Sequence, residues 1–151
     1  MFQPLEPEVR RGGRGDEGLE LRLEVPSDLA YVGEAVELVA RHCPAGLLSP
    51  RRVAFNLRTA LAEALANAIL YGNGRDPAKR VHVRVEAERD ALRLHVSDDG
   101  GGFDPRSLPN PTLRENLERE DGRGLFVMRH LVDHVSFNEQ GNAVCLTFRA
   151  G

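Results

Sequence analysis

Two pairs of alternating segments constrain the fold of this chain more than any other feature of its sequence. In residues 81–85 and 92–96, valine or leucine occupies every second position, charged or polar residues lie between them, and a short polar turn separates the segments. Residues 135–137 and 144–148 repeat the arrangement around Gly141. A period of two indicates half-buried strands, and such short connections join antiparallel neighbours. The chain therefore contains hairpins, which excludes a doubly wound parallel sheet with a helix between successive strands.

One further strand and one amphipathic helix precede these hairpins. Residues 19–25 alternate between apolar and charged residues, so they predict a fifth strand. Ser27 and Asp28 are both suitable N-caps for a helix over residues 29–43, where apolar residues recur every three or four positions.

Two other helices complete the set of predicted elements. Ser49 followed by a proline opens a helix that runs to about residue 71, and the Gly-Asn-Gly of residues 72–74 ends it. Residues 124–133 also have helical spacing. Five strands and three helices pack most economically as an α/β (α+β) two-layer sandwich, in which one mostly antiparallel sheet carries all the helices on one face.

Two segments lack a sustained apolar pattern. Residues 1–18 combine proline, glycine and charge, so we expect a flexible tail ahead of one domain over residues 19–151. Residues 99–121 are rich in glycine, proline and charge and are too long for an idle connection, so we expect a mobile lid.

The charge balance limits the partners that the chain can bind. Its 20 Lys and Arg residues against 23 Asp and Glu residues give a net charge of -3, which provides no basic field for nucleic acid or an anionic membrane. No apolar run approaches the roughly 20 residues that cross a bilayer, so we expect a cytoplasmic protein without membrane contact. The only lysine, Lys79, is not part of a GxxxxGK[ST] pattern, which excludes a P-loop.

Glu63 and Asn67 are the first candidate site residues. Apart from a tyrosine hydroxyl, they are the only polar side chains in residues 60–71, and their spacing of four puts a carboxylate and a carboxamide on one helix face. They can converge there on a metal and a nucleophile. Equally, with Asn56 and Thr59, they can form the solvent edge of an ordinary helix.

Two glycine-containing segments are the other candidates. Asp98 ends a strand and is followed by three glycines at residues 100–102, which allow a ligand to approach the backbone, although such a segment is also ordinary turn chemistry. Gly122 and Gly124 open a helix whose free N–H groups and dipole favour a phosphate. Arg119 and Arg123 lie beside them and can bind a polyphosphate.

Together these segments resemble the GHKL ATPase superfamily, specifically its anti-sigma-factor serine kinases of the RsbW/SpoIIAB type. The resemblance covers residues 19–149 and rests on three motifs in the family's order: an N box in residues 63–68, a DxGxG box in residues 98–102 and a GxG box in residues 122–124. It implies a Bergerat-type, histidine-kinase-like ATPase fold with an ATP lid. One departure is Asn142, which follows Gly141 where family members often have threonine.

The resemblance also assigns roles to individual residues. It implies that Glu63 is the general base for a serine hydroxyl, that Asn67 is a Mg²⁺ ligand, and that Asp98 binds the adenine amino group of ATP. Arg119 would meet the γ-phosphate, with Arg123 or Arg114 as alternatives. The glycines would allow the nucleotide to approach and would hold its phosphates: Gly100, Gly102, Gly122 and Gly124.

The implied function is an ATP-dependent protein serine/threonine kinase that acts as an anti-sigma factor. Its partners would be a sigma factor and an anti-anti-sigma (STAS-type) protein as substrate. The alternatives are a switch kinase in a partner-switching cascade and a nucleotide-dependent binding clamp without kinase activity. We also expect a homodimer, because the family pairs through its sheet and residues 19–25 could add to an edge.

Overall fold

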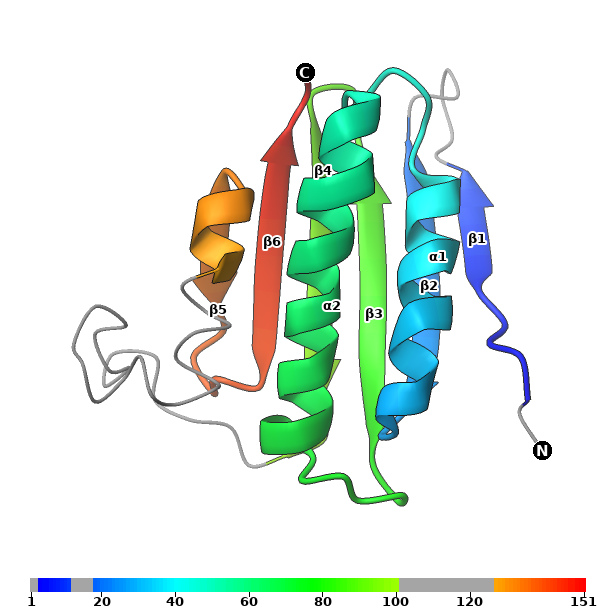
Figure 1. The fold of residues 1–151 in the computed structure, drawn as a ribbon, viewed down its shortest axis with the longest axis vertical. Helices are drawn as coiled ribbons and strands as arrows, with labels where there is room; N and C mark the ends of the chain where they lie inside the picture. The colour runs from blue at the N-terminus through cyan, green and yellow to red at the C-terminus, as the bar shows by residue number, and fades with distance from the viewer. Residues whose placement is uncertain (1–2, 12–17, 101–126) are drawn as a thin grey trace.

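The structure, a computed structural model, describes residues 3–11, 18–100 and 127–151, and its described strands form one sheet covered by helices on one face (Figure 1). The strand order is β1-β2-β3-β4-β6-β5, and every neighbouring pair is antiparallel. The predicted two-layer sandwich is confirmed. The strands are β1 (Glu8–Arg11), β2 (Leu19–Pro26), β3 (Arg80–Ala87), β4 (Ala91–Asp98), β5 (His134–Phe137) and β6 (Ala143–Arg149).

The register of the hairpins explains the alternation in the sequence. Val85 faces Leu94 across β3 and β4, and Leu94 faces Leu146 across β4 and β6, so one row of side chains points at the helices. All three are buried. The intervening residues, such as Arg84 and His95, form a matching row on the opposite, uncovered face.

The helical layer consists of two long helices and a short third one. A turn, η1 (Leu29–Tyr31), leads into α1 (Val32–His42), and residues 127–131 are helical in the described part of the predicted third helix. The longest helix crosses the sheet as three consecutive segments: η2 (Arg52–Leu57), α2 (Arg58–Asn67) and η3 (Ala68–Gly72).

The longest helix begins and ends where the sequence predicts. The Ser49 hydroxyl oxygen accepts a hydrogen bond from the Arg52 N–H at 3.2 Å, which is an N-cap contact. After η3 the chain turns sharply, with Gly74 and Arg75 both at φ 58°. The side chains that face the sheet are fully buried and recur every four residues: Leu57, Leu61, Leu65 and Ile69.

This helix is unusually apolar for its length. Arg52–Gly72 spans 21 residues and is apolar enough, by length and composition alone, to cross a membrane. A helix that packs lengthwise on its own sheet passes the same test, and here the apolar face is the one buried against the strands. The finding is weak evidence for a membrane-spanning segment.

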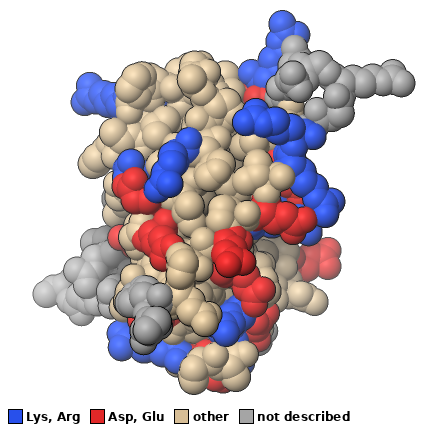
Figure 2. All heavy atoms as spheres, turned by 90° about the vertical axis from the view of Figure 1, so that its right-hand side faces the viewer, with Lys and Arg blue, Asp and Glu red and all other residues tan. Residues whose placement is uncertain are grey.

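The tail prediction is wrong for residues 8–11, which form β1 and pair with β2. All four residues of β1 are exposed, so they lack the apolar alternation by which the other strands are found. Opposite charges face each other in this hairpin instead, Glu8 against Arg22 and Arg10 against Glu20. Figure 2 looks at this side of the molecule and shows acidic and basic side chains interspersed on it.

Two smaller expectations also change. Because β1 pairs with one side of β2 and β3 with the other, residues 19–25 are not an edge to which a second copy could add. Of the two predicted caps, only Asp28 acts as one, and it caps η1, the turn before α1: its carboxylate accepts from the Ala30 N–H at 3.0 Å, and Leu29 is 40% exposed. The predicted lid lies outside the described residues except for Asp99 and Gly100.

Candidate functional site

Glu63 and Asn67 lie one turn apart on α2, which the sheet-facing residues of the helix fix in place. Both side chains are half-buried, whereas Ala60, Ala64 and their apolar neighbours on the sheet side are buried. Within the described parts of the chain, no hydrogen bond or ion pair to another side chain is found for either residue. A carboxylate and a carboxamide are thus held one turn apart at one helix face.

Asp98 is the last residue of β4, and its carboxylate is folded back over the turn that follows. Oδ1 accepts the N–H of Gly100 at 2.8 Å. Burial raises the pKa of the Asp98 carboxyl, the Gly100 N–H lowers it in part, and the neighbouring Asp99 charge raises it further. This carboxylate is less hydrated than a surface one, so it gains more from a ligand that donates a hydrogen bond to it.

Gly72, the last residue of η3, is what allows Asp98 to lie so close to the helix. A Cβ added at Gly72 would overlap the Asp98 carboxylate, and one added at Gly100 would overlap the carbonyl oxygen of Gly72. Two glycines, one from the helix end and one from the turn after β4, therefore enclose the carboxylate without side chains of their own.

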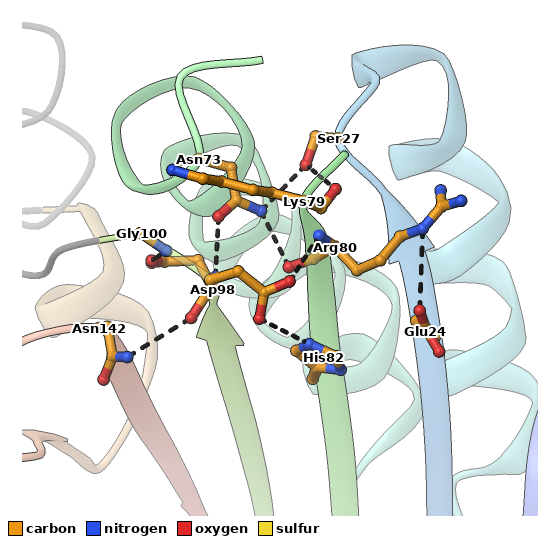
Figure 3. A network of polar contacts seen from close by, with 10 residues as sticks. Glu24, Ser27, Asn73, Lys79, Arg80, His82, Asp98, Gly100 and Asn142 are labelled. Atoms are coloured by element: carbon orange, nitrogen blue, oxygen red, sulfur yellow. Dashed lines mark hydrogen bonds and ion pairs between the residues drawn. The ribbon is translucent and has the colours of Figure 1, made fainter. Parts of the chain in front are cut away.

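Asn73 connects this turn to the rest of the fold and was not predicted as a site residue. Its side chain is only 3% exposed, and its Oδ1 accepts the N–H of Asp99 at 2.8 Å. Its Nδ2 donates to the Ser27 hydroxyl oxygen and to the Arg80 carbonyl, both at 2.9 Å. Figure 3 shows Asn73 at the centre of these contacts, between β4 and the chain at Ser27. One buried carboxamide thus joins four segments of the chain.

Asp99, next to Asp98, has the opposite environment. Its carboxylate accepts the Arg80 N–H at 2.8 Å and lies 3.0 Å from Nε2 of His82. These two contacts hold the pKa of Asp99 below its ordinary value. Asp99 is thereby turned toward β3 and Asp98 toward the helix, so adjacent carboxylates have different roles: one anchors the turn and the other faces the site.

Asn142, the departure from the family pattern, contacts the same turn from the last hairpin. Its carbonyl accepts the Asp98 N–H at 2.9 Å, and its Nδ2 lies 3.5 Å from the Asp98 carbonyl (Figure 3). The residue therefore supports the end of β4 through its backbone, a contact that does not depend on a threonine side chain.

The structure brings only part of the predicted site together. Asp98 and Gly100 meet the end of the helix that carries Glu63 and Asn67, at the end of the molecule where the undescribed segment begins (Figure 1). The other predicted residues lie outside the described part of the chain: Gly102, Arg114, Arg119, Gly122, Arg123 and Gly124.

Among the described residues, Asn67 is the candidate for binding a cation, and it would do so as a single protein ligand. Among residues 3–11, 18–100 and 127–151, no group of three or more His, Cys, Asp or Glu side chains could hold a metal. Mg²⁺ usually takes one or two protein oxygens and completes its shell with water and substrate phosphates. The carboxamide oxygen of Asn67 fits that requirement as a single protein ligand.

Gly72 and Asn73 contact the turn at Asp98 to Gly100, although the sequence did not predict them as site residues. Their sequence predicts only a helix stop, because glycine and asparagine are common at helix ends. The one signal available was the choice of asparagine, which can both donate and accept, immediately after an apolar helix. Which groups it would reach could not be deduced from spacing.

A family model described as histidine kinase-like ATPase domain matches residues 25–148. Three relatives illustrate the range of similar proteins. The chain is 28% identical over 91 residues to the serine/threonine-protein kinase BtrW of Bordetella bronchiseptica, covering 59% of this chain and 64% of BtrW. It is 33% identical over 89 residues to an anti-sigma F factor of Geobacillus thermodenitrificans, covering 57% and 60%. It is 26% identical over 130 residues to the serine-protein kinase RsbW of Oceanobacillus iheyensis, covering 80% and 79%.

The matches agree with the resemblance drawn from the three motifs. For the first two relatives the aligned part is less than two thirds of the relative's own length, whereas the match to RsbW extends over about four fifths of both chains. The family match includes Glu63, Asn67 and Asp98.

Proposed function

The chain belongs to the histidine kinase-like ATPase domain family, and from that premise we propose that it is an ATP-dependent protein serine kinase that also acts as an anti-sigma factor. The observation that carries the proposal is the half-buried Asp98 carboxylate, enclosed by Gly72 and Gly100 at the end of the helix that bears Glu63 and Asn67. The names of the relatives, two kinases and an anti-sigma factor, support the activity.

In this proposal Asp98 selects the base of the nucleotide. A carboxylate only accepts hydrogen bonds when ionised, so it pairs with the amino group of adenine and disfavours a carbonyl at the same position. The Asp98 carboxylate can lie against the end of the helix because neither Gly72 nor Gly100 has a side chain. The phosphates would then extend toward the helix face at Asn67.

Phosphoryl transfer requires positioning and charge stabilisation more than covalent chemistry from the protein. The serine oxygen of the substrate forms a bond to the γ-phosphorus as the bond from that phosphorus to the oxygen of the ADP leaving group breaks. The Glu63 carboxylate accepts the proton that the hydroxyl loses. Asn67, four residues later, orients the phosphate end of the nucleotide, and Mg²⁺, when bound there, would neutralise phosphate charge.

Lid residues would complete the phosphate site. Arg119, with Arg123 or Arg114 as alternatives, would meet the γ-phosphate, and Gly102, Gly122 and Gly124 would offer backbone N–H groups. The partners in this proposal are a sigma factor and a STAS-type anti-anti-sigma substrate, in the cytoplasm. We also propose a homodimer, through a surface other than β2, which is paired on both sides.

The experiment that tests the proposed function is Glu63→Gln, assayed for transfer of phosphate from ATP to a STAS-type anti-anti-sigma protein from the same genome. Glutamine keeps the shape of the side chain but cannot accept the proton, so we expect a loss of about 10² to 10⁴ in rate with ATP affinity largely retained. Asn67→Ala should differ, because ATP binding itself would weaken and would lose its dependence on Mg²⁺.

The matched control is Glu88→Gln, the same change in the turn between β3 and β4, at the end of β4 away from Asp98. It should leave transfer unchanged. Equal rates for wild type and Glu63→Gln would remove Glu63 as the base. If wild type binds ATP but phosphorylates no serine-bearing partner, the chain is a nucleotide-dependent clamp instead.

A further inference from the structure

Asn73 holds the backbone beside Asp98 from the helix side. Three consecutive N–H groups, starting at the last residue of β4, each have a different acceptor: Asp98 donates to the Asn142 carbonyl, Asp99 to the Asn73 side chain, and Gly100 to the Asp98 carboxylate. Only the middle contact ties this turn to the helix by a side chain. It joins residues 26 positions apart in the sequence.

The orientation of the Asn73 carboxamide is fixed by its surroundings. Nδ2 points at two acceptors, the Arg80 carbonyl and the Ser27 hydroxyl oxygen, and that hydroxyl donates in turn to the Lys79 carbonyl at 2.7 Å. Oδ1 is left for the Asp99 N–H. Because every polar atom of this buried side chain is engaged, a flipped carboxamide would place a donor against the Asp99 donor.

We infer that Asn73 is a positioning residue that sets the base selectivity of Asp98, an inference that rests on the proposed ATP-binding function. The Asp98 carboxylate can discriminate between bases only if it is held at a fixed place relative to the helix end. Gly72 allows the close approach, but its contact is steric and does not fix direction. The Asn73–Asp99 hydrogen bond fixes the orientation of this turn relative to the helix end. Asn73 directly follows Gly72, and Asp99 directly follows Asp98.

The test compares ATP with inosine triphosphate, which has a carbonyl oxygen where ATP has the amino group. Wild type should bind ATP much more tightly, because the carbonyl would face the Asp98 carboxylate without a proton between them. In Asn73→Ala the ratio of the two affinities should fall by roughly tenfold, mainly through weaker ATP binding. Both affinities are measured by calorimetry alongside the melting temperature.

Ser27→Ala is the matched control. It removes one of the two acceptors of Asn73 Nδ2 but leaves the Arg80 carbonyl and the contact to Asp99. It should lower the melting temperature while keeping the affinity ratio of wild type. Asn73→Asp, whose buried carboxyl group keeps, when protonated, an acceptor for the Asp99 N–H and a donor for the Arg80 carbonyl, should preserve the ratio better than Asn73→Ala and serves where Asn73→Ala is too unstable to assay.

The outcomes separate this inference from the proposed function. A selective wild type with an unselective Asn73→Ala supports it. If wild type is selective and Asn73→Ala is equally selective, the positioning role is overturned and the proposed function stays intact. The same holds if Asn73→Ala cannot be assayed and Asn73→Asp is as unselective as Asp98→Asn. A wild type that binds neither nucleotide overturns both.

Discussion

The two ends of the longest helix are built from different chemistry. At its start, the Arg52 guanidinium donates to the Arg149 and Gly151 carbonyls at 2.6 and 3.0 Å and to the Asp133 carboxylate at 2.8 Å. At its far end, Gly72 and Gly100 enclose the Asp98 carboxylate, and no ion pair to Asp98 is found among the described residues. The Asp133 carboxylate at the start of the helix therefore has a cationic partner, whereas Asp98 at the far end has none among the described residues.

The pKa values of Asp133 and Asp98 shift in opposite directions for this reason. The Arg149 N–H and the Arg52 guanidinium lower the pKa of Asp133, whereas burial raises the pKa of Asp98. Ionised Asp133 therefore stabilises the folded protein, and ionised Asp98 costs it stability. The contacts of Arg52 and Asp133 at the start of the helix stabilise the fold. The Asp98 carboxylate at its far end is poorly compensated, as expected where a bound ligand is to donate the missing hydrogen bond.

The largest expected effect comes from adding a side chain at Gly72, at the far end of the longest helix. Gly72→Ala places a methyl group on the Asp98 carboxylate and displaces it, so we expect ATP affinity to fall by about a hundredfold, the equivalent of losing a charge-assisted hydrogen bond. Calorimetric titration with ATP measures this. Gly33→Ala in α1 is the control, because a Cβ there meets nothing within 4 Å. Unchanged ATP affinity in Gly72→Ala would place the base elsewhere.

A paired substitution should move stability in opposite directions at the two ends. Asp133→Asn breaks the partly exposed ion pair to Arg52 and should lower the free energy of unfolding by about 1 kcal/mol. Asp98→Asn removes a half-buried charge while keeping Oδ1 for the Gly100 N–H, so the ligand-free protein should become more stable as ATP affinity falls. Urea unfolding without nucleotide checks both. Destabilisation by Asp98→Asn would show that its charge is compensated after all.

The smallest expected effect concerns pH: the stability differences between wild type and the two variants should disappear in a fixed order as the pH is lowered. The folded pKa of Asp98 is raised, so its cost is fully present above that pKa and disappears as the pH falls toward the ordinary value of about 3.9. The folded pKa of Asp133 is lowered, so its benefit persists to a pH below that value. The advantage of Asp98→Asn over wild type should therefore vanish at a higher pH than the deficit of Asp133→Asn. Urea midpoints between about pH 2 and 7 reveal the order, and the reverse order would contradict the two assignments.

Much of the fold could be predicted because its signals are local. A period of two marks β2, β3, β4 and β6, and a serine cap followed by proline marks the start of the longest helix, since neighbouring residues decide both. The prediction failed for β1, where all four residues are exposed and the stabilising contacts are backbone pairing and cross-strand charges with β2. Nothing within those four residues indicates a strand.

The sequence by itself determined which chemical groups the candidate site could contain. Glu63 and Asn67 could be named as candidates because polar groups in an apolar helix are costly, and Asp98 because a carboxylate precedes a run of glycines, but each pattern alone also fitted an ordinary helix edge or turn, and only the three motifs together favoured a site. The tertiary structure alone decided how Asp98 is held. Its enclosure by Gly72, and the contact of Asn73 with Asp99, join segments 26 residues apart. Those contacts depend on where the longest helix crosses the sheet, and packing of the whole core fixes that position, which no local pattern contains.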